Sequence, residues 1–269
     1  MKRVLAAAGA LALAAFLAAS PEFSAAWRVE FYVNFQRQAI PAESLAGCGL
    51  FLHQHLGERW GGLSSASLAA RLPEGALRVR YPNMLFKGYW PFWSSKPGFE
   101  FADSLLDGFI ERGLSAAEAL HMTLRCDLDR LFGLGRMLGE TLAVERAKEL
   151  SSDVKYVHAL ESGFRSRQLF QTVNHPRAEL MLLVADGVLG VLGLPPLPED
   201  FRRTCPELYP EFELHIHPKV AAFHGLGFCP PGRRFNVFGQ GLTYEEYAAL
   251  YIDCRLSGRA DFTAYLQGA

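Results

Sequence analysis

The stretch LAGCGLFLHQH, residues 45–55, sets the fold class of this chain. Its apolar centre, residues 49–52, has the length and composition of a short buried strand, and polar residues follow it directly. SSASLAARL at 64–72 opens with serines and predicts a short helix, and residues 77–79 predict another strand. Together with an alternating strand at 27–35, this order predicts an α/β fold with a small parallel sheet.

The middle and the carboxyl-terminal part of the chain are predicted to be largely helical. The helical patterns cover residues 101–113, 115–124, 131–149, 177–194 and 243–256. Ser115 with Glu118, and Thr243 with Glu246, have the spacing of capping boxes. Because no internal repeat or low-complexity linker interrupts the chain, we expect a single domain over residues 1–269.

Composition excludes several classes of function. The chain has 269 residues, half of them hydrophobic, and a net charge of −1, which argues against nucleic acid as the main partner. The five cysteines are scattered without a CxxC pair, so we expect reduced thiols in a cytosolic protein and no structural zinc. His215 and His217 lack an evident third ligand, and we therefore expect no metal site. The sequence also contains no GxGxxG, P-loop or GxSxG motif.

The amino terminus has two interpretations. Lys2 and Arg3 precede VLAAAGALALAAFLAAS, an apolar run of about signal-peptide length, so residues 1–26 have the features of an export signal. The same residues also fit a first strand, a turn at Gly9 and a helix that ends before Pro21. We favour the strand and helix, and hence a cytoplasmic protein with no stable membrane insertion.

Candidate site residues follow from the carboxyl ends of the predicted strands, where parallel α/β sheets bind their ligands. The loops there contain Gly9, Gln54 and Asn83. His175 belongs to an NHP sequence before a helix, with Pro176 predicted at the first helical position and Asn174 as a candidate helix cap. A histidine at such a junction is well placed to reach into a crevice. A purely structural role stays open for Gln54, Asn83 and Asn174, and His175 could likewise be only a helix-entry residue.

The stretch YPNMLFKGYWPFW, residues 81–93, concentrates aromatic rings around two prolines and a glycine. It is either packing at one end of a core or the wall of a pocket that faces His175. Lys155, Arg165 and Arg167 form a basic group along the chain, which is either a solvated surface or a phosphate-binding site.

Several longer stretches together resemble the WcbI-type polysaccharide biosynthesis proteins of bacterial capsule loci. They are FLHQHLGERWG, SSASL, RVRYPNMLFKGYWP, DSLLDGFIERGLSAAEAL, RQLFQTVNHPRAELM and LTYEEYAALY. The patterns PN-x-x-F-x-GY-x-P and LF-x-T-x-NHP at this separation are the most specific part, and the likeness spans residues 20–252.

The resemblance implies an SGNH-hydrolase-like fold and a protein that binds coenzyme A as a substrate and acts as an acetyltransferase on capsule sugars. By this analogy His175 is the base, and Asn83 or Gln54 stabilises an oxyanion. Residues expected to contact coenzyme A or acetyl-CoA are Gly9, Phe86, Gly88, Tyr89, Lys155, Arg165, Arg167 and Asn174. The partners are then a CoA thioester and a sugar or polysaccharide precursor.

One departure from the family concerns the turn after the first strand. The family usually carries Gly-Asn-Cys-Gln there, whereas this chain reads AAAGALALAA. A cysteine at that turn would be a plausible thiolate nucleophile, and only Ser20, at the far end of the helix, could replace it. Three functions therefore stay open, namely direct transfer with His175 as base, a non-catalytic CoA-binding protein of the same pathway, and an exported SGNH-like esterase.

Overall fold

The computed structural model describes residues 2–7, 10–32, 36–96 and 98–268. Contacts divide the chain into two compact units, each made of three segments. Unit 1 comprises Met1–Met84, Glu145–Leu160 and Arg177–Leu208. Unit 2 comprises Leu85–Val144, Glu161–Pro176 and Tyr209–Ala269. Each unit is described below by itself, and one domain over the whole chain stays a prediction.

Unit 1 is built on a four-stranded parallel sheet with the strand order β2-β1-β3-β4. The strands are β1 (Lys2–Ala7), β2 (Trp27–Tyr32), β3 (Cys48–His53) and β4 (Leu77–Arg80). β2, β3 and β4 coincide with predicted strands, because their apolar runs are short and bounded by turn residues. The predicted α/β class with a small parallel sheet is confirmed.

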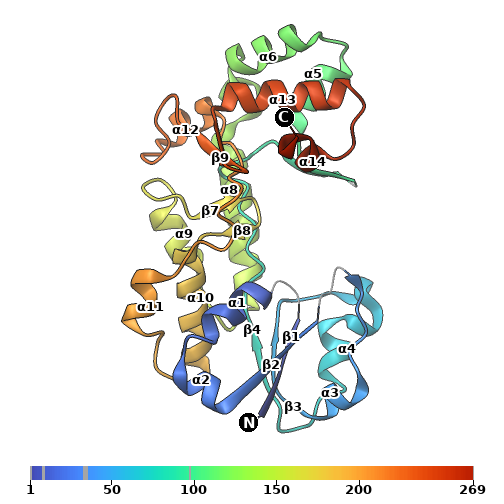
Figure 1. Ribbon diagram of the computed structural model, residues 1–269, viewed down its shortest axis with the longest axis vertical. Coiled ribbons are helices and arrows are strands. Elements are labelled where there is room, and N and C mark those ends of the chain that lie inside the picture. Colours follow the sequence, from blue (N-terminus) through green and yellow to red (C-terminus); the bar gives the residue numbers. More distant parts are fainter. Residues whose placement is uncertain (1, 8–9, 33–35, 97, 269) are drawn as a thin grey trace. The chain divides into compact units, whose positions relative to one another are not determined.

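Helices cover both faces of this sheet, as expected for parallel strands (Figure 1). α3 (Ala42–Ala46) and α4 (Ser65–Ala69) lie on one face. α1 (Ala10–Leu17) and α10 (Ala178–Val191) pack against each other on the other face. Unit 1 also contains the 3-10 helix η2 (Glu58–Leu63) and α11 (Glu199–Thr204).

The core of unit 1 follows from the alternation of side chains along its strands. Leu5 and Phe51 are partners in the register of β1 and β3, and both are fully buried. They belong to one apolar cluster with Leu45 of α3 and Leu68 of α4. Burial of each such side chain contributes about 1.5–3 kcal/mol, so this cluster fixes the two short helices to the sheet.

The amino-terminal segment forms β1 and α1, as favoured from the sequence, and the turn predicted at Gly9 lies outside the described residues. α1 ends at Leu17, two residues earlier than expected. A further helix, α2 (Pro21–Ala26), then begins, because the Ser20 hydroxyl accepts a hydrogen bond from the Phe23 N–H at 3.2 Å.

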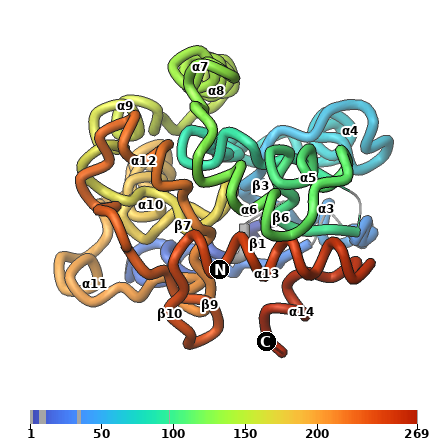
Figure 2. Tube along the Cα trace, turned by 90° about the horizontal axis from the view of Figure 1, so that it is seen from above, coloured from blue at the N-terminus to red at the C-terminus, as the bar shows by residue number. Residues whose placement is uncertain are grey.

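Unit 2 consists of short helices and three hairpins. Its helices are α5 (Ser104–Glu111), α6 (Ala116–Arg125), α7 (Leu128–Phe132), α12 (Pro218–His224), α13 (Tyr244–Leu256) and α14 (Phe262–Gln267). Its hairpin strands are β5 (Trp93–Lys96), β6 (Phe99–Asp103), β7 (Phe170–Thr172), β8 (His175–Pro176), β9 (Phe235–Val237) and β10 (Gln240–Leu242). α5, α6 and α13 lie side by side (Figures 1 and 2). Two further helices, α8 (Leu134–Leu150) and α9 (Val157–Gly163), contribute residues to both units.

Both predicted capping boxes are present. Ser115 and Glu118 satisfy each other's backbone N–H groups at the start of α6, and Thr243 and Glu246 do so at the start of α13. The helix predicted from residue 131 is divided by Gly133, whose φ of +70° ends α7.

Two helix starts differ from the sequence prediction. α5 begins at Ser104 rather than at residue 101, because Phe99–Asp103 pairs with β5 as a strand. α10 begins at Ala178 with Arg177 at its cap, so the prediction of Asn174 as the cap and Pro176 as the first helical residue is wrong. The reason is the pairing of β8 with β7, which places His175 opposite Thr172.

Among the described residues, no helix combines the length and hydropathy that a membrane span requires.

Candidate functional site

The carboxyl ends of three neighbouring strands of unit 1 lie level with one another. In the sheet register Ala7 of β1 is opposite His53 of β3, and His53 is opposite Arg80 of β4. Parallel α/β sheets bind ligands outside this edge. The loops after β3 and β4, both predicted to form the site, therefore leave the sheet next to each other. The third predicted loop, with Gly9, lies outside the described residues.

Gln54 connects these two loops. Its side-chain Nε2 donates a hydrogen bond to the Pro82 carbonyl at 3.3 Å, and the Tyr81 N–H donates to the His53 carbonyl at 3.1 Å. A carboxamide carries two N–H donors, so one is fixed and the other is left for a ligand. The structure thus brings Gln54 and the turn that contains Asn83 together in unit 1, as the sequence predicted.

Asn83 is exposed, and its main-chain carbonyl is held by the half-buried Lys148, which pairs with the buried Glu145. Its carbonyl accepts from Lys148 Nζ at 3.1 Å, and the same ammonium lies 2.6 Å from the Glu145 carboxylate. Glu145 is 1 % exposed and also accepts a hydrogen bond from the Tyr156 hydroxyl. A carboxylate at this depth is stable only when paired, so the pair fixes the turn.

Ser65 and His53 hold the loop after β3, and sequence analysis did not identify this contact. The Ser65 hydroxyl lies 3.2 Å from His53 Nδ1 and 3.3 Å from the Gln54 carbonyl, and it accepts from the Leu56 N–H at 2.9 Å. The His53 ring stacks on Phe51, and burial lowers the His53 pKa to about 4. The serines at residues 64 and 65 signalled only a helix start, because the return of the loop to β3 has no sequence signature.

His175 lies in unit 2, on β8. Its Nδ1 is 2.7 Å from the Thr172 hydroxyl, and its ring packs against Tyr209 with centroids 4.3 Å apart. Burial lowers the pKa of this imidazole, and the nearby Glu211 carboxylate acts in the opposite direction. The side chain is half-buried and neutral at pH 7.

The contacts around Thr172 fix the orientation of the His175 ring. The Thr172 hydroxyl lies 2.7 Å from His175 Nδ1 and 3.2 Å from the Asn174 carboxamide oxygen. With Nδ1 held at Thr172, Nε2 is the ring nitrogen left to meet a ligand.

The predicted ligand-contacting residues of the aromatic stretch are core residues of unit 2. Phe86 and Tyr89 are fully buried, and their rings meet edge to face with centroids 5.0 Å apart. The Tyr89 hydroxyl donates to the Phe164 carbonyl at 2.8 Å. A Cβ on Gly88 would lie 2.2 Å from the Phe86 ring, so close packing requires glycine here. Packing explains all three residues, and a role in CoA binding stays a prediction.

The predicted basic residues are exposed and already make hydrogen bonds. Lys155, in unit 1, donates to the carbonyls of Glu149 at 2.6 Å and Ser152 at 2.8 Å. Arg165, in unit 2, donates from Nε to the His224 carbonyl at 3.2 Å. Arg167 lies in the same loop of unit 2. Phosphate contacts by these three residues stay a prediction.

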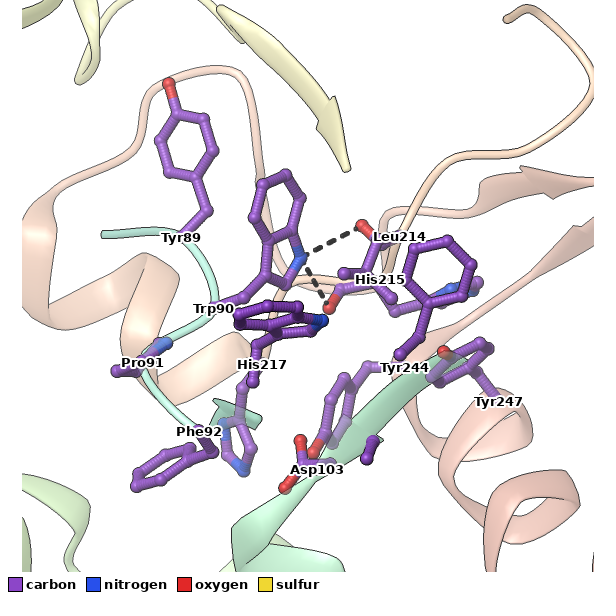
Figure 3. Close-up of a pocket in the computed structure, with 13 residues that line it drawn as sticks. Tyr89, Trp90, Pro91, Phe92, Asp103, Leu214, His215, His217, Tyr244 and Tyr247 are labelled. Carbon is purple, nitrogen blue, oxygen red and sulfur yellow. Dashed lines mark hydrogen bonds between the residues drawn. The ribbon is translucent and has the colours of Figure 1, made fainter. Parts of the chain in front are cut away.

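Unit 2 contains a small cavity beside the aromatic stretch (Figure 3). It encloses about 30 Å³, room for about two water molecules. Its lining residues are Tyr89, Trp90, Pro91, Phe92, Trp93, Phe101, Ala102, Asp103, Leu214, His215, His217, Tyr244 and Tyr247. The stretch is therefore both core and cavity wall. The imidazoles that line this cavity together with the stretch are those of His215 and His217. His175, which the sequence predicted to face the stretch, is not among the lining residues.

The two histidines of this cavity are neutral and fixed. Burial lowers the pKa of His215 to about 3 and that of His217 to about 4. His215 Nε2 donates to the Leu242 carbonyl at 3.0 Å, and His217 Nε2 donates to the Thr123 carbonyl at 3.1 Å. His217 Nδ1 also accepts from the Lys219 N–H at 3.0 Å. These imidazoles connect segments of unit 2, and no cluster suited to a metal ion occurs among the described residues.

Three polar atoms at the cavity have no hydrogen-bond partner within the described chain. They are His215 Nδ1, Tyr244 Oη and Tyr247 Oη. The neighbouring Asp103 carboxyl has its pKa raised to about 6, chiefly by burial. Buried polar groups of this kind are usually satisfied by internal water, and the cavity is large enough for it. Sequence analysis did not identify Asp103, Tyr244 and Tyr247 as cavity residues, because each lies in a segment that it predicted to be helical.

The sequence profile described as polysaccharide biosynthesis enzyme WcbI matches residues 4–197, more than half of the chain. This chain belongs to the WcbI family. The match contains β2, β3, β4 and all but the first two residues of β1, together with the aromatic stretch and the NHP sequence, which confirms the family resemblance drawn from those motifs. The comparison with curated proteins finds no match.

A solved structure of WcbI has the same fold. It is 20 % identical in sequence, and the alignment covers 99 % of this chain and 92 % of that one with a TM-score of 0.79. That protein is described as a novel polysaccharide biosynthesis enzyme, in a native form without a disulfide bond between coenzyme A and a cysteine. At this identity the likeness establishes the fold of the WcbI-family chain and not its activity.

Proposed function

We propose that this WcbI-family protein binds coenzyme A and transfers the acetyl group of acetyl-CoA to a sugar hydroxyl during capsular or surface polysaccharide assembly in the cytoplasm. The observation that carries the proposal is the family match over residues 4–197. The solved WcbI structure, whose description refers to coenzyme A, supports the choice of ligand. The kinship with SGNH hydrolases is part of the proposal.

His175 is the proposed general base. Its Nε2 lone pair takes the proton of the sugar hydroxyl while the hydroxyl oxygen attacks the thioester carbonyl. The carbon–sulfur bond then breaks, and the departing CoA thiolate takes the proton from the His175 imidazolium, which restores the neutral base. The Thr172 hydroxyl, 2.7 Å from Nδ1, supports this role because it holds the ring in one orientation. General-base catalysis contributes about 10²–10⁴-fold to such rates.

Gln54 or Asn83 is the proposed donor to the oxyanion that forms on the thioester carbonyl. The fixed carboxamide of Gln54 supports the first choice, because its Nε2 is anchored on the Pro82 carbonyl at 3.3 Å. Donors that are oriented before the reaction contribute more than mobile ones. Asn83 has a fixed main chain and an exposed side chain, so its carboxamide is the less preorganised of the two.

The proposed CoA contacts are those predicted from the family resemblance. Lys155, Arg165 and Arg167 would meet the phosphates, and Phe86, Gly88 and Tyr89 would support pantetheine or adenine through packing. Asn174 and Gly9 complete the set. Lys155 supports this assignment because an ammonium has three donors and only two are used, on the Glu149 and Ser152 carbonyls.

A second candidate function is CoA binding without catalysis. It is favoured by the sequence after β1, where residues 7–10 are Ala-Ala-Gly-Ala and contain no thiol. Cys48 lies at the opposite end of β3, and burial raises the pKa of its thiol, so it offers no thiolate. Direct transfer needs no cysteine, and the two candidates therefore differ only in the role of His175.

The experiment compares His175→Ala with His158→Ala, a matched control because His158 is exposed on α9. Thermal-shift titrations with CoA and acetyl-CoA measure binding, since a ligand of the native state raises the melting temperature. We expect the melting temperatures of the unaltered chain and of both variants to respond to CoA. Only His175→Ala is expected to lose acetyl transfer, by about 100-fold or more.

The outcomes separate the candidates. Polysaccharide acetylation that is unaltered in cells carrying only the His175→Ala protein would support the non-catalytic protein. A chain whose melting temperature does not respond to either CoA species would contradict both. Activity on acetyl esters without CoA, together with removal of residues 1–26 from the mature protein, would instead favour the exported esterase.

A further inference from the structure

A second, larger pocket lies in unit 2, and we call it the α12 pocket. It is open to solvent, since Ala222, Pro230 and Pro231 in its lining are exposed, and its volume of about 510 Å³ is within the range of small-molecule sites. Its wall is mainly apolar and includes Ile216, Ala221, Ala222, Leu226, Pro230 and Phe235. Apart from Leu124, every lining residue lies beyond residue 197, where the family match ends. None of the residues proposed to bind coenzyme A lines it.

The main-chain donors around the α12 pocket are largely used inside the protein. The Gly225 N–H donates to the Ala222 carbonyl at 3.2 Å, and the Gly227 N–H donates to the Arg165 carbonyl at 2.8 Å. The Cys229 N–H donates to the Leu226 carbonyl at 3.0 Å, and the Arg233 N–H donates to the Pro230 carbonyl at 3.1 Å. A phosphate or carboxylate needs several free donors that point at it. The loop from 225 to 233 therefore does not offer an anion site.

The charged side chains of the pocket also disfavour an anion. The Arg233 guanidinium donates to the Phe228 carbonyl at 2.6 Å, lies 3.4 Å from the Glu213 carboxylate and stands over the Phe235 ring. Its charge is thus compensated within the protein. Glu245, exposed in the first turn of α13, is the other charged lining residue, and it would repel an anionic group. Burial raises the pKa of the Cys229 thiol, which is therefore neutral.

We propose that the α12 pocket binds an uncharged alkyl chain, such as the tail of a neutral amphiphile. The mainly apolar wall fits an alkyl chain. A fatty acid or a phosphate fits less well, because the main-chain donors of the pocket are largely used inside the protein and the Glu245 carboxylate repels an anion. Each methylene that such a chain buries strengthens binding about four-fold. The inference goes beyond the proposed transfer reaction, and its test contains no coenzyme A.

The first experiment uses two fluorescent probes with related ring systems on the unaltered chain. Phenylnaphthylamine is uncharged, and anilinonaphthalene sulfonate is an anion. We expect one molecule of the neutral probe to bind per chain, with an affinity about ten-fold or more above that of the anion, because Glu245 repels the sulfonate and no free cation among the described residues of the pocket offsets that repulsion. Decanol should displace the neutral probe about fifteen-fold better than octanol, whereas decanoate should not displace it.

The second experiment locates the site. Ala222→Trp fills the pocket from α12, and Ala117→Trp is the matched control, because Ala117 is exposed on α6 and does not line the pocket. We expect the first variant to weaken the neutral probe about ten-fold or more, through loss of the cavity, and the control to leave it unchanged. Glu245→Gln should strengthen binding of the anionic probe and leave the neutral probe unaffected.

Three results would overturn the inference. They are equal affinity for the two probes, displacement by decanoate as effective as by decanol, and unchanged binding in a folded Ala222→Trp variant. If circular dichroism shows that Ala222→Trp does not fold, the comparison of decanol with decanoate on the unaltered chain decides the ligand class alone.

Discussion

Unit 1 and unit 2 use buried histidine differently. In unit 1 the buried histidine is His53, which ends a strand and holds a loop together with Ser65. In unit 2 the imidazoles of His215, His217 and His224 are buried among aromatic rings. His217 uses both of its nitrogens in hydrogen bonds, so it connects segments and is not available to a substrate.

This difference indicates which side chains are available to bind a ligand or to take part in catalysis. At the carboxyl edge of unit 1, Gln54 Nε2 uses one of its two N–H donors on the Pro82 carbonyl and keeps the second for a ligand. In unit 2, His175 Nδ1 is held at Thr172, and Nε2 is the ring nitrogen left to meet a ligand. A side chain that keeps one hydrogen-bonding atom or donor free of protein contacts can act on a ligand. A side chain whose hydrogen-bonding groups are all used within the protein stabilises the fold.

Acid should produce the largest difference between the units. The unfolded histidines bind protons below a pH of about 6.5, whereas His217 and His224 stay neutral in the folded state until pH falls to about 4 and His215 until about 3. Stability is therefore lost as pH falls from about 6.5 to about 4, on the order of 3 kcal/mol for each histidine. Asp103 acts in the opposite direction, because its raised pKa of about 6 favours the folded state as pH falls.

Acid destabilises unit 2 through the three buried histidines, which Asp103 partly offsets, whereas it destabilises unit 1 through His53 alone. We therefore expect unit 2 to unfold first as pH falls. The measurement is pulsed hydrogen exchange after incubation at each pH, read separately for the segments of each unit. Earlier exchange of β1 and β3 than of α6 and α13 would contradict the expected order.

Two glycines allow a comparison of packing between the units. A Cβ at Gly88 in unit 2 would lie 2.2 Å from the Phe86 ring, and one at Gly187 in unit 1 would lie 2.5 Å from Val154. Both substitutions to Ala should destabilise by about 1–3 kcal/mol through overpacking. Gly190→Ala is the control on α10, with no atom within 4 Å of its Cβ, and should stabilise by up to about 1 kcal/mol.

The free energy of unfolding in urea gives the magnitude of each change, and hydrogen exchange shows which unit it affects. Gly88→Ala is expected to loosen unit 2, and Gly187→Ala to loosen unit 1. A neutral effect of Gly88→Ala would show that the Phe86 ring can move aside, and that this part of the core is less tightly packed than its contacts indicate.

The smallest predicted effect concerns the loop that Ser65 holds in unit 1. Ser65→Ala removes the acceptor of the Leu56 N–H at 2.9 Å and the contact with the Gln54 carbonyl. We expect a loss of about 1–2 kcal/mol and faster hydrogen exchange in residues 54–64. Ser67→Ala, which removes a contact with the Ser64 hydroxyl at 2.9 Å, is the matched control. Equal effects of the two variants on this loop would mean that Ser65 has no special role in it.

Local patterns predicted the fold where each element depends on its own residues. The strands at 49–52 and 77–79 were found because a short apolar run between turn residues has few alternatives. The capping boxes at Ser115 and Thr243 were found because the motif is local. Residues 101–103 were assigned to a helix because β6, to which they belong, exists only through its pairing with β5.

The candidate site was predicted in part for the same reason. Gln54 and the turn of Asn83 meet because parallel strands end at one edge of a sheet, which the order of elements implies. The supporting contacts of Ser65 and Lys148 were not predictable, since each arises from a chain segment that returns from elsewhere in the sequence. Asn174 was assigned to a helix cap, whereas the β7–β8 pairing makes its carboxamide an acceptor for Thr172.

The sequence by itself determined the α/β class, the family and the caps of two helices, because hydrophobic period, motif spacing and capping are properties of neighbouring residues. Only the tertiary structure decided which nitrogen of His175 is held at Thr172, and which imidazoles face the aromatic stretch. Those properties depend on burial and on hydrogen-bond partners far away in the chain. Such contacts form only when the chain has folded, and no local pattern specifies them.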